Sequence, residues 1–211
     1  VTTAALPTPI KPAVDNTKPA SDSKPKLPFT DVSTSDWFYS DVMFVYENGL
    51  FSGTDSRSFS PNASMTRAML VTVLYRAAGE PSVTGITNKF TDNKQGKYYY
   101  NAVLWASNKG IVNGATATTF DPDGNITREQ IAAILYRYAG KPSGYYSNPF
   151  KDVGATSEAS YYKAILWAVG KGITTGTSAT TFSPNASCTR AQIVTFLWRA
   201  SGSPEPKTAS N

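Results

Sequence analysis

Histidine is absent from this chain of 211 residues, and cysteine occurs only once, at Cys188. Without histidine the chain cannot form a Ser-His-Asp or Cys-His catalytic group, a histidine-ligated zinc site or an imidazole general base. A single cysteine excludes an internal disulfide, an all-cysteine zinc site and a cysteine-ligated iron–sulfur cluster. Because no apolar run approaches the roughly 20 residues that cross a bilayer, we expect no membrane insertion. The composition predicts no enzyme, no metal site and no cofactor.

Positive charge is modest and dispersed, with 20 Lys and Arg against 15 Asp and Glu and a net charge of +5. No stretch is a dense run of Lys and Arg, whereas proteins that bind nucleic acid usually concentrate such residues in one stripe. We therefore expect no nucleic-acid partner.

Residues 1–28 are predicted to be a linker. Prolines interleave there with Lys, Ser and Thr, and nothing apolar recurs at a helical or strand period. Such a segment cannot bury enough surface to offset its ordering entropy, and its prolines favour an extended spacer. The chain begins at Val1 instead of Met, so we expect a further domain N-terminal to this linker. Residues 205–211 are expected to be a short tail.

The remaining residues form three copies of one unit, predicted to span residues 29–88, 89–149 and 150–204. Four landmarks recur every 60–62 residues, which makes the repeat assignment strong. They are Phe-x-Asp from residues 29, 90 and 150, Gly-apolar from 49, 110 and 172, Phe-x-Pro from 59, 120 and 182, and Thr-Arg from 66, 127 and 189.

Each copy reads as a helix, an irregular loop and a second helix, as copy two illustrates. Gly110 ends the first helix, because glycine adopts the left-handed conformation without steric cost. Thr127 is a natural N-cap for the second helix, and Gln130 completes a capping box. An apolar stripe follows at spacings of three and four: Ile131, Ile134, Leu135 and Tyr138. We predict an all-α fold whose long loops carry the function.

These motifs together resemble the S-layer homology family, a module of about 60 residues that is usually found as three tandem copies. The resemblance covers residues 29–202. It implies a pseudo-threefold prism around a central three-helix bundle, in a monomer with an internal pseudo-trimer. It also implies non-covalent attachment, in grooves between copies, to an anionic secondary cell-wall polysaccharide that is often pyruvylated. The chain would then lie at the extracellular cell wall and tether a larger exported protein.

The sequence departs from the family motif Thr-Arg-Ala-Glu at its fourth position, which holds Met69, Gln130 and Gln192. Glutamine can still complete a capping box, whereas Met69 cannot. Either the departure alters a ligand contact, or it only lowers the stability of copy one.

The sharpest ligand candidates are Arg67, Arg128 and Arg190, each directly after an N-cap. A cation at this end of a helix is unfavourable by roughly 0.3–1 kcal/mol, so its recurrence invites an explanation. One is an anion held by the guanidinium together with free N–H groups of the first turn. The other is structural, with each arginine pairing to an aspartate or a loop carbonyl and joining the repeats.

Trp37 and Tyr98 are the aromatic candidates, because sugar rings present apolar faces that pack on flat side chains. They stand at equivalent positions before the first helices of copies one and two, and Ser160 stands there in copy three. Trp37 is either a sugar platform or part of a hydrophobic staple. Since Ser160 has no ring, we expect the third site to be weakened.

Two further recurring residue types complete the candidate ligand-binding set. The glycines allow either a close approach of ligand or a left-handed turn. The aspartates of Phe-x-Asp accept either sugar hydroxyls or local backbone N–H groups. These candidates are Gly53, Gly114, Gly176, Asp31, Asp92 and Asp152.

The sequence thus predicts a wall-anchoring module that binds an acidic polysaccharide. The alternative is a protein–protein scaffold whose surface recruits a partner at the cell surface.

Overall fold

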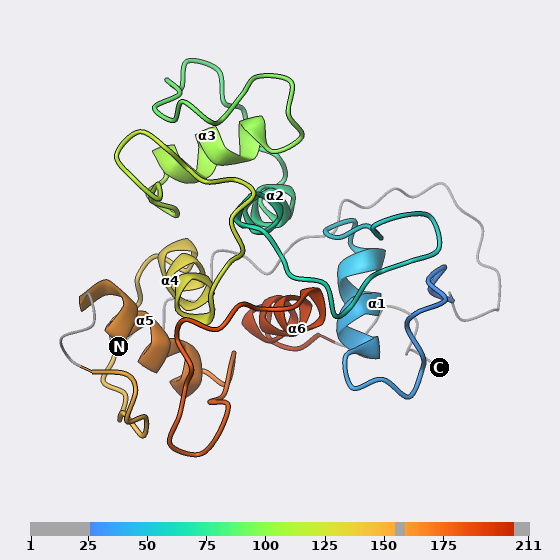
Figure 1. Cartoon of the computed structure of the whole chain (residues 1–211), viewed down its shortest axis with the longest axis vertical. Helices are drawn as coiled ribbons and strands as arrows, with labels where there is room; N and C mark the ends of the chain where they lie inside the picture. The colour runs from blue at the N-terminus through green and yellow to red at the C-terminus, as the bar shows by residue number, and fades with distance from the viewer. Residues whose placement is uncertain (1–25, 155–158, 205–211) are drawn as a thin grey trace.

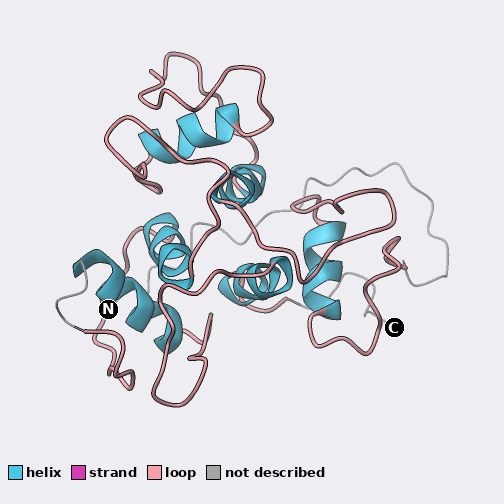
Figure 2. Ribbon diagram, viewed as in Figure 1, coloured by secondary structure: helices cyan, strands magenta, loops and turns pink. Residues whose placement is uncertain are grey.

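The computed structural model describes residues 26–154 and 159–204. The regular elements in these residues are all helices, with no strand among them, which confirms the predicted all-α fold class (Figure 2). Each copy contributes two helices joined by a long irregular loop. The helices are α1 (Tyr39–Glu47), α2 (Arg67–Ala77), α3 (Tyr100–Asn108), α4 (Arg128–Tyr138), α5 (Ala159–Gly170) and α6 (Arg190–Ala200).

The helix ends follow the predicted signals. Gly49, Gly110 and Gly172 follow the first helices with φ of 65°, 66° and 69°, so each copy ends its first helix in the left-handed conformation. The threonine before each second helix accepts the N3 backbone N–H. Full capping boxes form in copies two and three, whereas Met69 leaves copy one with half of one.

The helices pack between copies. α2 lies against α3 of copy two, α4 lies against α5 of copy three, and α6 returns to pack on α1 of copy one (Figure 1). Each second helix therefore covers the first helix of the following copy. The boundaries drawn between copies remain predictions, but the three copies close into a ring.

Backbone hydrogen bonds join the copies at the centre. Met65 N–H donates to the Cys188 carbonyl at 3.2 Å, Cys188 N–H donates to Ile126 at 3.1 Å, and Ile126 N–H donates back to Met65 at 2.9 Å. The three side chains are at most 1 % exposed. Cys188 is thus a buried residue of the core, and burial raises the pKa of its thiol to about 11.

The N-termini of α2, α4 and α6 are also satisfied by the following copy. In α2, the N–H groups of Arg67 and Ala68 donate to the carbonyls of Gly124 and Pro122, both at 3.0 Å. The other two helices repeat the pattern, with α6 reaching back to copy one. A helix end that needs carbonyls from a neighbouring copy ties local structure to assembly.

The prism and central bundle implied by the resemblance remain predictions. In Figure 1, α2, α4 and α6 surround the centre of the view, and α1, α3 and α5 lie outside them. The N-termini of these central helices donate to loop carbonyls of the following copy, and the Arg128 guanidinium of α4 lies 5.8 Å from the centroid of the Phe196 ring of α6. Most of the predicted linker, residues 1–25, and the tail at 205–211 lie outside the described residues. No described helix is both long and apolar enough to span a membrane.

Candidate functional site

Arg67 is a buried cation at the junction of copies one and two, with 8 % of its surface exposed. Its Nε donates to the Phe120 carbonyl at 2.9 Å, and its Nη2 donates to the Asn113 carbonyl at 2.8 Å. The guanidinium carbon lies 4.7 Å from the centroid of the Phe120 ring. These contacts are those of the structural alternative, in which the arginine binds loop carbonyls and joins the repeats.

Arg128 and Arg190 repeat this arrangement around the ring. The Nε of Arg128 donates to the Phe182 carbonyl at 2.8 Å, and the Nε of Arg190 donates to the Phe59 carbonyl at 2.8 Å. Each Nη2 donates to a second carbonyl of the same loop, and each guanidinium stacks on the same phenylalanine. The three arginines therefore join each copy to the next.

The expectation of free N–H groups beside these arginines is wrong. The first two N–H groups of α2, α4 and α6 donate to carbonyls of the following copy, and the third donates to the N-cap threonine. An anion near the arginines would therefore be held by side chains. Whether the arginines contact ligand stays a prediction.

The recurring aspartates hold the Phe-x-Pro turns. Asp92 accepts the N–H of Phe120 at 2.8 Å through Oδ1 and that of Asp121 at 2.7 Å through Oδ2. Asp31 and Asp152 make the same two bonds in their own copies. Burial tends to raise the pKa of Asp92, but the backbone amides outweigh it and the pKa lies below its ordinary value. Local capping is the alternative that these contacts support.

The backbone conformation of the middle residue of each Phe-x-Pro turn explains why the aspartate hydrogen bonds are needed. Ser60, Asp121 and Ser183 are left-handed at φ of 57°, 59° and 59°, a region that residues with a side chain seldom adopt. Two carboxylate hydrogen bonds hold each turn in that conformation.

Gly53, Gly114 and Gly176 are required by crowding. None of the three is left-handed, so the prediction of a left-handed turn is wrong. A Cβ at Gly114 would collide with the carbonyl oxygens of Thr116 and Thr119 and with the Phe90 ring, and the other two glycines have the same neighbours in their copies. Each glycine lets the phenylalanine of Phe-x-Asp pack directly against the loop.

Trp37 and Tyr98 are exposed aromatic rings, at 65 % and 62 % of their surface. Each stands edge-on to the aromatic residue after it, with ring centroids 5.1 Å apart. Tyr98 lies close to Thr66, the N-cap of α2, and so lies where copies one and two meet. Both rings are available to a sugar. The side chain of Ser160 lies outside the described residues.

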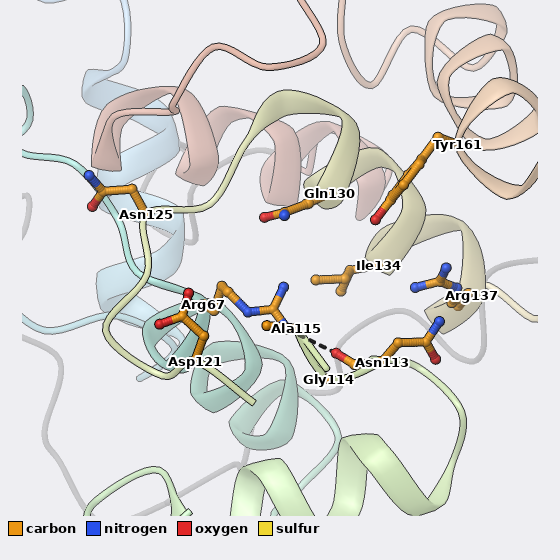
Figure 3. Close-up of a pocket in the computed structure, with 10 residues that line it drawn as sticks. All are labelled: Arg67, Asn113, Gly114, Ala115, Asp121, Asn125, Gln130, Ile134, Arg137 and Tyr161. Carbon is orange, nitrogen blue, oxygen red and sulfur yellow. Dashed lines mark hydrogen bonds between the residues drawn. The ribbon is translucent and has the colours of Figure 1, made fainter. Parts of the chain in front are cut away.

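A cavity of about 250 Å³ lies at the junction of copies one and two, and Tyr161 of copy three also lines it. Gln130 and Tyr161 face Arg67 and Asn113 across it, with Arg137 at one end (Figure 3). Its walls come from α2, from the loop of copy two, and from the adjoining helices α4 and α5. The lining residues are Arg67, Asn113, Gly114, Ala115, Asp121, Asn125, Gln130, Ile134, Arg137 and Tyr161.

Sequence reasoning missed Arg137. It ends a Leu-aromatic-Arg motif of the second helix, which recurs with Arg76 and Arg199, and the spacing alone could have marked it. The structure brings together the ligand candidates Arg67 and Gly114 and the capping residue Gln130. Arg137 joins them as a second cation. Asp92 and Tyr98 are not among the residues that line this cavity.

The cavity is electropositive. Burial lowers the pKa of Arg67 from its ordinary value, opposed by the nearby charge of Asp121. The hydrogen bonds of its guanidinium go to neutral carbonyls, which satisfy the donors but do not neutralise the charge. Two guanidinium groups against one carboxylate leave a site suited to an anion.

The threefold pattern assigns the matching residues at the other two junctions. By their spacing, Arg128, Gly176 and Gln192 are the equivalents of Arg67, Gly114 and Gln130 at the second junction, and Arg190, Gly53 and Met69 are the equivalents at the third. The Met69 departure therefore belongs to the junction of Arg190. Within the described residues, no group of three potential metal-ligating side chains occurs.

Comparison with known proteins places these features in a family. The model of the S-layer homology domain matches residues 28–68, 89–132 and 149–194. An S-layer protein of Bacillus thuringiensis subsp. finitimus is 28 % identical over 172 residues, covering 80 % of this chain and 21 % of that protein. An endoglucanase of Bacillus sp. (strain KSM-635) is 30 % identical over 185 residues, covering 82 % of this chain and 19 % of that protein.

A shorter match involves an amylopullulanase of Thermoanaerobacterium thermosulfurigenes, 34 % identical over 115 residues, which cover 51 % of this chain and 6 % of that protein. The chain spans about a fifth of the length of the first two relatives. Domains of this family are binding modules that anchor surface proteins to the cell wall. With three matched copies over more than half of its length, the chain belongs to the S-layer homology domain family.

Proposed function

We propose that the chain binds an acidic, pyruvylated secondary cell-wall polysaccharide in the grooves between its copies and so tethers a larger exported protein to the extracellular face of the wall. The observation that carries the proposal is the cavity that both Arg67 and Arg137 line. The proposal extends the family's anchoring role to a specific ligand chemistry.

Two guanidinium groups favour a planar anion over a neutral sugar. Arg67 is held in place by its carbonyl bonds and the Phe120 ring, so little side-chain entropy remains to be lost when ligand binds. Arg137 is half-buried at the other end of the cavity. A pyruvate ketal carries one carboxylate on a sugar ring, and guanidinium groups bind carboxylates through paired hydrogen bonds.

The remaining lining residues suit the sugar around that carboxylate. The amides of Asn113, Asn125 and Gln130 supply donors and acceptors for hydroxyl groups. At about 250 Å³ the cavity is slightly smaller than the roughly 300–1,000 Å³ of drug-sized pockets, which suits a single sugar residue. The rest of the polymer would continue along the surface.

The decisive experiment compares binding of purified wall polysaccharide before and after removal of its pyruvate groups. Arg137→Gln deletes one cation without touching the carbonyl bonds of Arg67, and we expect about tenfold weaker binding of the pyruvylated polymer. Lys109→Gln is the matched control, because it removes the same charge from an exposed position at the end of α3. It should bind like the parent protein.

Equal affinity for both forms of the polymer would exclude the guanidinium–carboxylate mechanism. Unchanged binding by Arg137→Gln would remove this cavity as the site. Retention of a wall protein in place of the polymer would favour the scaffold alternative.

A further inference from the structure

A second cavity, of about 460 Å³, lies away from the inter-repeat junction that holds Arg67, between the end of α4, the segment that follows it and α5. Its volume falls within the roughly 300–1,000 Å³ of typical ligand pockets. The two cavities have no lining residue in common. Its aromatic lining residues are Tyr136, Tyr145, Tyr146, Tyr162 and Trp167.

Copy two differs from the others in the way its second helix ends. In copy one the Tyr75 hydroxyl donates to the Pro81 carbonyl at 2.8 Å, and in copy three the indole N–H of Trp198 donates to the Pro204 carbonyl at 2.9 Å. Tyr136 stands at the equivalent position, and the described residues contain no such bond from its hydroxyl. Tyr136 instead lines the cavity.

A glycine in α5 makes room for the cavity wall. Gly170 stands where copies one and two have Glu47 and Asn108. A Cβ at Gly170 would collide with the Tyr146 ring, so the glycine lets the segment after α4 lie against α5. The aromatic cavity is therefore a local feature of the junction between copies two and three.

Trp167 contributes a buried donor with no partner. The residue is 3 % exposed and lines the cavity, and its ring lies 5.5 Å from that of Tyr136. Among the residues that the structure describes, its Nε1 has no hydrogen-bond partner. A buried donor without a partner is unfavourable, so the indole N–H is sensitive to any change in the packing of the cavity wall.

The charge at the cavity selects among possible occupants. Lys141 and Lys163 both line it, and no acidic residue is among its lining residues. The proline-rich segment at residues 1–28 suits an aromatic groove in shape, but it carries four lysines against two aspartates and would bring like charge to the lysines. A ligand with hydroxyl groups, apolar ring faces and negative charge fits better.

We propose that this aromatic cavity is a second glycan-binding site, which takes a sugar residue bearing an anionic group. The sugar ring packs on the tyrosine rings and against the Trp167 side chain, and the anionic group lies near Lys141 and Lys163. The site does not depend on the inter-repeat cavity, and a polymer that reached both would bind with added avidity.

The test follows the indole N–H resonance of Trp167, identified by its loss in Trp167→Phe, in nitrogen-15 correlation spectra. The probes are trigalacturonic acid, neutral maltotriose, sodium sulfate and a synthetic peptide of residues 7–28. We expect trigalacturonic acid to shift this resonance most, maltotriose to shift it at higher concentration, and sulfate and the peptide to leave it in place.

Two variants at exposed positions keep the fold intact. Tyr145 lines the cavity and is 96 % exposed, so Tyr145→Ala removes a ring without disturbing packing and should weaken both saccharides about tenfold. Lys163→Gln should weaken only the acidic saccharide, about threefold. Lys109→Gln serves as the charge control, and Arg137→Gln should leave the Trp167 response unchanged, which separates this site from the first.

A Trp167 resonance that moves with neither saccharide would overturn the proposal. So would a larger response to the peptide, which would assign the cavity to the chain's own proline-rich segment. Equal affinities for the two saccharides in the parent protein would contradict the role of the lysines.

Discussion

At the scale of single residues, the recurring arginines and aspartates hold loops and copies together. Arg67 makes two hydrogen bonds to carbonyls of the next copy and stacks on a phenylalanine ring. Asp92 fixes a left-handed turn through two backbone N–H groups. A residue that recurs in every copy need not touch ligand, because the assembly of three copies requires the same contact three times.

Arg67→Ala should lower the free energy of unfolding by about 3 kcal/mol, because hydrogen bonds to a charged group are lost and buried carbonyls are left unsatisfied. Urea unfolding with an unchanged slope would measure the effect. Lys97→Ala, at an exposed position, is the control and should be neutral. An Arg67→Ala protein as stable as the parent would contradict the joining role.

Asp41 is a buried carboxyl at the contact between α1 and α6, and it accepts the Thr195 hydroxyl. Burial raises its pKa, with smaller opposing effects from the Thr195 bond and the charge of Arg199. Because the native pKa is raised, the stability that protonated Asp41 contributes is fully present below its unfolded-state pKa of 3.8. That stability is lost as the pH rises through the native pKa.

Asp41→Asn keeps an acceptor for Thr195 but removes the buried charge. Its Tm should therefore exceed that of the parent at pH 7, and the difference should vanish as the pH falls toward 4. Thermal unfolding at a series of pH values measures this. A constant difference across the series would show that the charge of Asp41 is not the cause.

At the scale of elements, helix α2 is the one second helix without a full capping box. Thr66 accepts the N3 backbone N–H, but Met69 offers no acceptor to the backbone N–H of Thr66. The equivalent backbone N–H groups in copies two and three bond to Gln130 at 3.3 Å and to Gln192 at 3.0 Å. The sequence at N3 thus distinguishes three otherwise similar helices.

Met69→Gln should complete this box and raise the free energy of unfolding by about 0.5–1 kcal/mol. Met69→Leu is the matched control, since it keeps an apolar side chain and adds no acceptor. The measurement is the urea midpoint of both variants. Equal midpoints would mean that the missing bond has no energetic consequence in this helix.

At the scale of the whole molecule, the three copies form a closed ring in which α6 of the last copy packs on α1 of the first. A linear repeat array is stabilised by contacts between neighbours and can lose its end units independently. Here each second helix needs carbonyls from the following copy, and copy three obtains them from copy one. No copy is terminal, so the described fold should behave as one cooperative unit.

Unfolding should accordingly follow a single transition, with tryptophan fluorescence and far-UV circular dichroism giving the same midpoint. Deleting residues 29–88 removes the partners of α3 and α6 and should abolish cooperative unfolding. Deleting residues 1–25 is the control and should leave the midpoint unchanged. If copies two and three alone unfolded cooperatively, the ring would not be the stabilising unit.

The helices, their caps and the number of copies could be predicted from the amino-acid sequence, because these features depend on local patterns. Glycine after a helix, threonine before one and an apolar stripe at spacings of three and four act within a few residues. The arginines, aspartates and glycines could also be picked out by their recurrence. Their roles could not be predicted, because a residue that makes a buried contact in every copy and a residue that binds ligand in every copy recur at the same spacing.

Which residues lie next to one another across copies is known only from the tertiary structure. Arg67 of copy one, Gln130 and Arg137 of copy two and Tyr161 of copy three line one cavity, although they are far apart in the chain. Because the three copies close into a ring, Met69 corresponds in position to the junction of Arg190. The first-turn N–H groups, which were expected to be free, donate to carbonyls of the following copy. The physical reason is that the helices pack across copies, so each junction takes its side chains from more than one repeat.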